Sequence, residues 1–301
     1  MGKLRRGKIL NKPGILGILT FIVFSFNGCY KFQGDQTVPA YLKIDSISLS
    51  TYYPEEGSNS QKITDVWAYV DDNLVGVFEL PALFPVLAKG KHKLQLYSGI
   101  KLNGISSTRV PYPFYLPIVY DDFDFYEDSV QVPGNLNTEY YPGLTFAWME
   151  DFEGPDIKLD ETSISDTVIK RTRDGAFVTE TSKYSGVINL TDDKPIYSAV
   201  SFDAYPIPKA GSPTMLELNY KTDNLFNAGL LIQESNQIIK VPLVIVSHSD
   251  EWNKIYINLG PNLSLHPNAT EFKVLIEAGL EQDKQSASIY LDNIKMIYRS
   301  L

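Results

Sequence analysis

The segment Trp252-Asn253-Lys254-Ile255-Tyr256-Ile257-Asn258-Leu259 decides the fold class of this chain. Ile255, Ile257 and Leu259 alternate with polar or amphipathic residues, and this period of two is typical of a half-buried β-strand. The same alternation recurs in three other runs of the C-terminal half, 216–220, 272–278 and 288–296. No convincing apolar stretch at helical spacing follows the first thirty residues, so the sequence predicts an all-β protein.

The N-terminal half shows shorter strands separated by clear turns. Residues 66–78 alternate about the polar turn Asp71-Asp72-Asn73, which predicts a β-hairpin. A second turn at Lys89-Gly90-Lys91 leads into a predicted strand from His92 to Tyr97. The apolar residues change parity at Asp45-Ser46, which predicts a strand break there.

The length of 301 residues is enough for two ordinary domains. The pattern predicts a small β-sandwich over residues 41–115, a connector over 116–145 and a second β-sandwich over 146–301. In the connector, residues 120–128 interleave acids with aromatics. These acids could bind a divalent cation, or the aromatics could pack on the sandwich while the acids face water. The second interpretation is favoured because EF-hand spacing is missing.

The first thirty residues have the order of an export signal. Five basic residues precede an apolar run from Ile15 to Phe26 that is short for a transmembrane span. Gly28 and Cys29, the single cysteine of the chain, come directly after it. An exported protein with one cysteine can form no internal disulfide, so an unmodified thiol would be a liability.

The Gly28-Cys29 pair resembles the lipobox of bacterial lipoproteins, although Phe26 and Asn27 depart from its usual residues. The resemblance implies a signal peptide over residues 1–28, acylation of Cys29 and a lipidated leader over 29–40. It also implies an outer-membrane lipoprotein on the periplasmic or cell-surface side. The alternative is an unmodified Cys29 beside an uncleaved amphipathic anchor.

Charge excludes nucleic acid as a partner. Residues 1–28 hold five of the 27 basic residues and none of the 36 acidic ones, so the chain without them carries a formal charge of −14. Phosphate backbones require a basic patch, and the lysines and arginines here do not cluster. Anionic headgroups would repel such a body, so we expect the lipid to be its main membrane contact.

Two resemblances concern the two halves. The hairpin at 66–76 followed by the Gly90-Lys91-His92 strand start resembles PEGA-type and transthyretin-like or immunoglobulin-like sandwich modules, which implies a spacer or docking domain. The start Glu150-Asp151-Phe152-Glu153, the strand opened by Trp252 and the closing run 289–294 resemble galactose-binding-like jelly rolls, including carbohydrate-binding modules. This second resemblance covers about half of the chain.

The jelly-roll resemblance implies a structural calcium ion, with Asp151 or Glu153 near the first strand and Asp292 of the final strand as ligands. Paired carboxylates repel each other unless a cation or hydrogen bonds compensate them. The alternative is that Asp292 caps a turn and binds no metal.

Sugar binding is the functional implication of the same resemblance, because such sites use exposed aromatic rings beside a few polar groups. Trp148, Trp252 and Tyr220 are the candidates. Tyr220 shares its parity with the apolar residues of its strand and Trp252 opens a strand, so we expect both in the core or at its rim. Trp148 therefore remains the candidate ligand-binding residue.

Catalytic motifs are missing from the sequence. The histidines at 92, 248 and 266 stand far apart, and neither an HExxH pair nor a nucleophile elbow is present. A pair of acids acting as in glycosidases could not be chosen among 36. We therefore predict a protein that is not an enzyme and needs no cofactor other than a possible structural Ca²⁺.

Three short acid-hydroxyl-aliphatic runs, at 45–47, 128–130 and 166–168, resemble the O-glycosylation acceptor of Bacteroidetes. Together with the relaxed lipobox they favour a lipoprotein of that group. Two hypotheses on function remain: a glycan-binding surface lipoprotein, and a structural or assembly lipoprotein that holds a protein partner of the outer envelope.

Overall fold

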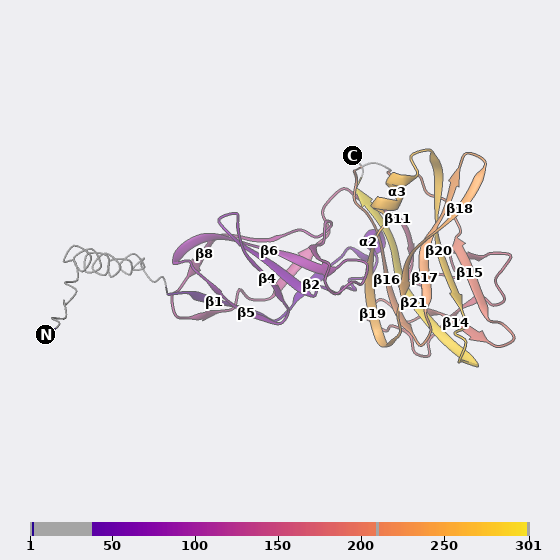
Figure 1. Cartoon of the computed structure of the whole chain (residues 1–301), viewed down its shortest axis with the longest axis horizontal. Coiled ribbons are helices and arrows are strands. Elements are labelled where there is room, and N and C mark those ends of the chain that lie inside the picture. The colour runs from indigo at the N-terminus through magenta and orange to yellow at the C-terminus, as the bar shows by residue number, and fades with distance from the viewer. Residues whose placement is uncertain (1, 3–37, 209–210, 300–301) are drawn as a thin grey trace.

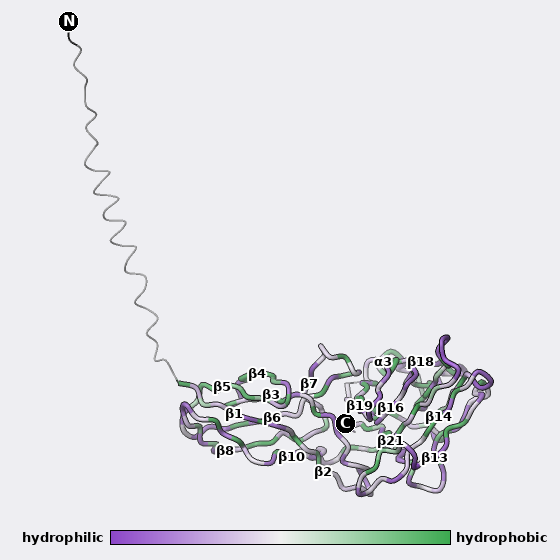
Figure 2. The backbone as a smooth tube through the Cα atoms, turned by 90° about the horizontal axis from the view of Figure 1, so that it is seen from below, coloured by the Kyte–Doolittle hydropathy of each residue, from purple (hydrophilic) through white to green (hydrophobic). Residues whose placement is uncertain are grey.

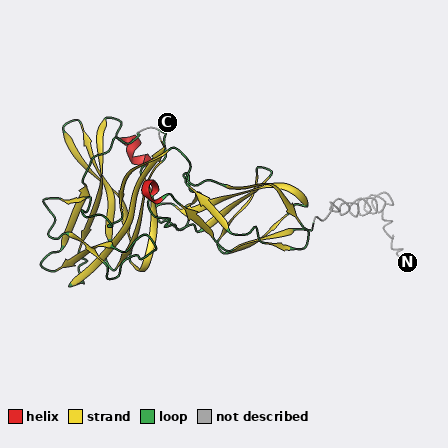
Figure 3. Cartoon of the chain, turned by 180° about the vertical axis from the view of Figure 1, so that it is seen from behind, coloured by secondary structure: helices red, strands yellow, loops and turns green. Residues whose placement is uncertain are grey.

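The computed structural model of the chain describes Gly2, residues 38–208 and residues 211–299. The predicted signal peptide and Cys29 lie outside these residues. Two β-sandwiches follow each other along the long axis of the molecule, and residue 38 enters at the far end of the first (Figure 1). Strands make up nearly all of the regular structure (Figure 3). The predicted all-β class with two sandwiches is confirmed.

The first sandwich consists of strands and one helical turn. Its elements up to residue 86 are β1 (Ala40–Ile44), β2 (Ile47–Ser50), α2 (Tyr53–Glu56), β3 (Asp65–Val70), β4 (Asn73–Glu79) and β5 (Ala82–Val86). The strands that follow are β6 (Gly90–Lys101), β7 (Arg109–Pro111), β8 (Ile118–Phe125), β9 (Val130–Gln131) and β10 (Leu136–Glu139). The predicted hairpin corresponds to β3 and β4, and the predicted break falls between β1 and β2.

The sheet order of this sandwich corrects the predicted connector over residues 116–145. One sheet has the order β4-β3-β6-β7 with β8 on β6, a second has the order β5-β1-β9, and β10 pairs with β2. The segment therefore supplies three strands of the first sandwich. Phe125 is buried while Asp121 and Asp122 are exposed. This agrees with the interpretation that the aromatics pack on the sandwich and the acids face water. Local alternation indicated a strand, but its partner lies about thirty residues earlier and could not be identified from the sequence.

The second sandwich begins at β11 (Leu144–Glu150), two residues before the predicted boundary. Its other elements before residue 223 are β12 (Leu159–Glu161), β13 (Ile169–Thr172), β14 (Ser185–Thr191), β15 (Ile196–Ser201) and β16 (Thr214–Thr222). The remainder are β17 (Phe226–Glu234), β18 (Gln237–Val246), β19 (Ser249–Asn258), α3 (Gly260–Leu265), β20 (Ala269–Gly279) and β21 (Ser286–Arg299).

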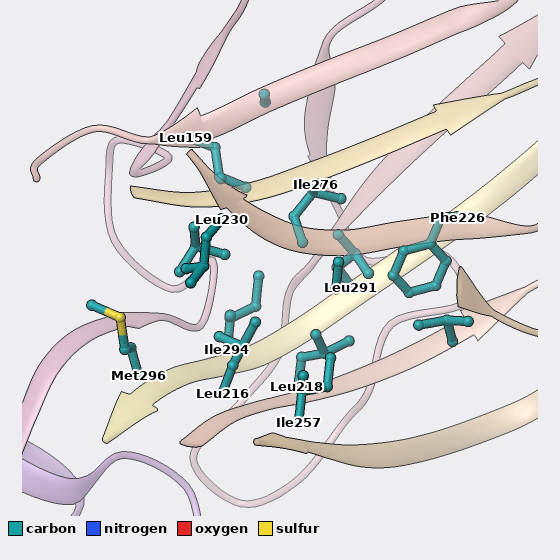
Figure 4. Packing of buried hydrophobic residues seen from close by; sticks show 14 of the residues in the cluster. Leu159, Leu216, Leu218, Phe226, Leu230, Ile257, Ile276, Leu291, Ile294 and Met296 are labelled. Atoms are coloured by element: carbon teal, nitrogen blue, oxygen red, sulfur yellow. The ribbon is translucent and has the colours of Figure 1, made fainter. Parts of the chain in front are cut away.

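These strands form a six-stranded and a five-stranded sheet. The first has the order β13-β14-β21-β16-β19 with β11 also on β21, and the second has the order β12-β15-β20-β17-β18. Leu218 of β16, Leu230 of β17 and Ile276 of β20 are fully buried between them (Figure 4). Burial of such side chains removes apolar surface from water at roughly 25 cal/mol per Å², which makes this layer the main source of stability.

The outer face of the six-stranded sheet is divided into a covered and an open half. Strands β16, β19 and β21 lie next to the first sandwich in both views of the chain (Figures 1 and 2). Asn103 donates its backbone N–H to the carbonyl of Tyr256 at 2.8 Å, and Ser60 donates to Asn219 at 2.9 Å. Apolar residues of both sandwiches, including Tyr115 and Ile297, form one buried cluster here.

An ionic network lies inside this interface. Glu217 is fully buried, and its carboxylate accepts hydrogen bonds from Tyr112 at 2.5 Å and Tyr140 at 3.1 Å. The ammonium of Lys254 lies 2.7 Å from the same carboxylate, and Lys295 donates to the carbonyl of Ser58 at 2.6 Å. Burial by itself would raise the pKa of Glu217, but Lys254, Lys295 and Tyr112 hold it below its usual value.

None of the helices among the described residues is long and apolar enough to cross a membrane.

Candidate functional site

The three acids predicted to bind calcium lie close enough to influence one another. Both Asp151 and Glu153 raise the pKa of Asp292 electrostatically, and all three raise the pKa of Tyr53. The fold thus brings the end of β11 next to β21, as the jelly-roll resemblance implied. The prediction of this proximity came from that resemblance and not from a pattern in the sequence itself.

Protein donors surround all three acids. Ser185 donates to Asp292 at 2.6 Å, and Tyr53 donates to Asp151 at 2.6 Å. Glu153 accepts from the backbone N–H groups of residues 183 and 184 at 2.6 and 2.7 Å. A calcium ion requires six to eight oxygens at 2.3–2.6 Å. In the described part of the chain, no group of three or more acidic, histidine or cysteine side chains could hold a metal ion. This donor set therefore does not fit calcium.

Burial explains the protonation of Asp292. Loss of hydration is the largest cause that raises the pKa of this carboxyl to about 8, and the charges of Asp151 and Glu153 add to it. The bonds from Ser185 and the backbone of Asn293 act in the opposite direction. A proton on Asp292 and hydrogen bonds on its neighbours thus limit the carboxylate repulsion for which the sequence suggested a cation.

Trp148 is not a surface platform. Its side chain is 3% exposed and belongs to the core of the second sandwich. A bulge at residues 146–148, where the pairing of β11 with β21 shifts, sets which side chains of β11 face inward. A bulge reverses the expected parity, so simple alternation could not place this ring. Tyr220 is a core residue, as expected.

The open half of the six-stranded sheet carries an aromatic surface formed by Trp252, Tyr290 and Phe177. Trp252 comes from β19, Tyr290 from β21 and Phe177 from the loop between β13 and β14. All three rings are half-buried, with centroids 5.4 Å apart for Phe177 and Trp252 and 6.3 Å apart for Trp252 and Tyr290. The edge-to-face angles of 67° and 68° give a stepped surface of partly exposed rings.

The loop from residue 173 to residue 184 fixes these rings in place. The Trp252 indole N–H donates to the carbonyl of Gly175 at 3.0 Å. Gly175 has a φ of +67°, and a Cβ there would lie 3.2 Å from the ring of Tyr290. A side chain at this position would be both strained and crowded. Glycine therefore lets the loop approach Tyr290 closely.

Polar groups surround the aromatic surface. Lys221 is the cross-strand partner of Tyr290, and its ammonium lies 5.9 Å from the centre of that ring. Two residues away along β21, Ser288 donates to Asn189 of β14 at 3.0 Å. The aromatic surface thus has an amine, a hydroxyl and an amide beside its partly exposed rings. This combination suits an amphipathic ligand.

The three histidines lie in separate places, each beside one acid. His92 pairs with Asp71 at 2.6 Å in the first sandwich, whereas the other two contact Glu281 and Glu234 in the second. The structure does not bring them together, and within the described part of the chain their hydrogen-bond partners are carboxylates and one backbone carbonyl. These pairs give no positive indication of catalysis.

Sequence reasoning missed Tyr290, Lys221 and Phe177 and treated Trp252 as a packing residue. The missed signal was parity. Tyr290 lies between the buried residues Ile289 and Leu291, and this alternation already places it on the outer face. Phe177 lies in a loop, so no periodic signal could have placed it.

Comparison with known proteins gives no family assignment, since no protein-family profile and no curated protein matches the chain. Among solved structures, a β-sandwich carbohydrate-binding module of promiscuous specificity aligns with 14% identity and a TM-score of 0.36, over 77% of this chain and 84% of that one. The family 11 carbohydrate-binding module of Clostridium thermocellum, in complex with a β-1,3-1,4-mixed-linked tetrasaccharide, aligns with 13% identity and a TM-score of 0.34 over 49% and 92%.

The enzymatically active domain of tailspike protein 4 from bacteriophage CBA120 aligns with 9% identity and a TM-score of 0.35. The alignment covers 52% of this chain and 19% of the tailspike chain, so the present chain spans about a fifth of that protein. TM-scores this low do not establish a shared site in any of the three cases.

Proposed function

We propose that the chain is a non-catalytic binding lipoprotein whose jelly roll binds carbohydrate on the surface formed by Trp252, Tyr290 and Phe177. The observation that carries this proposal is the set of half-exposed rings on the open half of the six-stranded sheet. Sugars present C–H faces that pack on aromatic rings and hydroxyls that hydrogen-bond to polar neighbours.

The surroundings of the rings favour a sugar over a purely apolar ligand. Lys221, Ser288 and Asn189 provide donors and acceptors in the same part of the sheet. The surface is also open, which suits a chain of sugar units better than a small molecule enclosed in a cavity. A long polysaccharide could therefore cross the strands without its ends being confined.

Membrane anchoring through Cys29 is the second part of this proposal. Support comes from the order of basic, apolar and cysteine-containing segments in the sequence and from the place where residue 38 meets the first sandwich (Figure 1). That end is opposite to the jelly roll. An anchor attached there would hold the aromatic surface away from the bilayer, where extracellular polymer is accessible.

Binding to a panel of soluble polysaccharides tests the carbohydrate part. Replacing Trp252 or Tyr290 by alanine should weaken binding by roughly tenfold or more, because a central aromatic anchor contributes on the order of 2 kcal/mol. Phe202→Ala is the matched control, since Phe202 is 61% exposed but follows β15 of the other sheet. Equal affinity of Trp252→Ala and Phe202→Ala would contradict this site.

The alternative function, an assembly lipoprotein that holds a protein partner, predicts a different result in these binding experiments. A stable copurifying protein, together with no binding to any polysaccharide, would replace the glycan proposal by an assembly role. Anchoring is tested separately by detergent-phase partitioning of the native chain and of Cys29→Ser. Loss of partitioning only in the variant is expected, and equal partitioning of both would overturn the lipid anchor.

A further inference from the structure

The end of the first sandwich that lies farthest from the jelly roll exposes several apolar side chains. Leu74 and Val75 lie at the start of β4, and Leu87 lies just after β5. Leu87 is 73% exposed and Leu74 is 50% exposed. All three line one hollow of about 760 Å³ together with Pro39. We call these residues, with Val38 and Val130, the tip surface.

The tip surface continues around the beginning of the described chain. Val38 directly precedes Pro39, and Val130 is the cross-strand partner of Tyr41, which also lines the hollow. Both valines are exposed. Single exposed apolar residues are ordinary, but a contiguous group of them marks a contact surface.

Three cationic side chains beside the tip surface are each paired with an acid. His92 lies 2.6 Å from Asp71, Lys93 lies 2.9 Å from Asp72, and Lys89 contacts Glu127 at 2.5 Å. Residues 29–301 as a whole are strongly acidic, with a formal charge of −14. An anionic bilayer would repel that body, whereas the three pairs reduce the net charge beside the tip surface, where the exposed Asp128 also lies next to Pro39.

We propose that the tip surface inserts its apolar side chains into the headgroup and acyl boundary of the membrane that holds the anchor. This inference rests on the anchoring part of the proposed function. Eight residues lie between Cys29 and Val38, so an acylated Cys29 would keep the tip surface within about 30 Å of the bilayer even if the leader were fully extended.

Because the anchor would already hold the tip surface near the membrane, a small apolar contact is enough for insertion. A tether converts membrane contact into an intramolecular step with a high effective concentration. Leu74 and Leu87 can each remove apolar area from water on insertion, and Lys89 and Lys93 can keep their charged ends at the headgroups. The inserted end of the first sandwich then fixes the orientation of the molecule, with the jelly roll pointing away from the membrane.

The test supplies the anchor chemically, so that its result does not depend on natural acylation. The mature chain 29–301 is coupled through its single cysteine to maleimide lipid in phosphatidylcholine vesicles. Hydrogen exchange of residues 73–75 and 86–90 is then compared between the coupled chain and the free chain. Exchange roughly tenfold slower on the vesicle, equivalent to about 1.4 kcal/mol, is expected at these residues and not at residues 202–205.

Variants separate insertion from simple nearness to the lipid. Leu74→Ser with Leu87→Ser should abolish the protection while coupling and folding persist, and Phe202→Ser should not change it. Equal exchange in coupled and free chains would overturn the proposal, including the case in which the leader itself covers the tip surface. Protection that rises with protein density on the vesicle would overturn it in favour of contact with a second copy.

Discussion

Asp292 shows how a single residue of the final strand takes a role that the sequence did not predict. The carboxyl is fully buried, accepts a hydrogen bond from Ser185 and lies near Asp151 and Glu153. Its pKa is raised to about 8, chiefly by burial. The residue therefore acts as a protonated member of a hydrogen-bonded acidic cluster.

A pH dependence of stability follows from this shift. Between about pH 4 and about pH 8, the folded state keeps a proton on Asp292 that the unfolded chain has lost, so the free energy of unfolding falls as pH rises and levels off above about pH 8. Asp292→Asn should reduce that fall, by at most about 6 kcal/mol. Urea unfolding across this pH range measures the difference between the two proteins.

Two controls accompany the measurement. Asp160→Asn alters an exposed acid of β12 and should leave the pH profile of the parent chain unchanged. Addition of a calcium chelator should also leave the midpoint unchanged, because protein donors surround the acids. A lower midpoint with chelator would restore the calcium interpretation.

At the scale of elements, close packing between β14 and its neighbours restricts what each strand can carry. Gly186 of β14 lies against Phe152 and Ile169, and a Cβ there would lie 2.5 Å from the Phe152 ring. Protein cores are close-packed, so the Phe152 ring and the Ile169 side chain leave no space for an added methyl group. Alternation alone would allow any small residue at this position.

Gly186→Ala should therefore destabilise the second sandwich by about 1–3 kcal/mol through overpacking. Gly279→Ala is the matched control, because a Cβ at the end of β20 would meet nothing within 4 Å. Thermal and urea unfolding of both variants measure the effect. Equal stability of the two would show that Phe152 moves aside at little cost.

At the scale of the whole molecule, Glu217 connects the two sandwiches. It belongs to β16, yet Tyr112 and Tyr140 of the first sandwich donate to it, while Lys254 of β19 lies 2.7 Å away. Buried charges are costly unless each is compensated. The orientation of the aromatic surface relative to the predicted anchor depends on this network, because the network joins the two bodies.

Glu217→Ala should cost about 3–5 kcal/mol, since it leaves Lys254 buried without its carboxylate partner. Separate unfolding transitions for the two sandwiches are also expected, because the interface loses its central acceptor. Urea unfolding followed by fluorescence and by circular dichroism detects both effects. Glu251→Ala on the exposed side of β19 is the control and should change little.

Prediction from the sequence was most successful where a strand pairs with its neighbour in the chain. The hairpin of β3 and β4, the break before β2 and the core parity of Tyr220 were all correct. The connector and Trp148 were wrong because pairing of β8 with β6 and the bulge in β11 depend on distant strands. The aromatic surface was missed although local parity already indicates the outward position of Tyr290, whereas Phe177 lies in a loop that gives no periodic signal.

Side-chain alternation was enough to predict the all-β class, the two sandwiches and most strand positions, because it reflects burial on one face of a sheet. The open half of the six-stranded sheet, the contact of Trp252 with Tyr290 and the shared exposed end of Leu74 and Leu87 became visible only in the folded chain. These features arise from contacts between residues far apart in the chain. Local periodicity carries no information about such contacts.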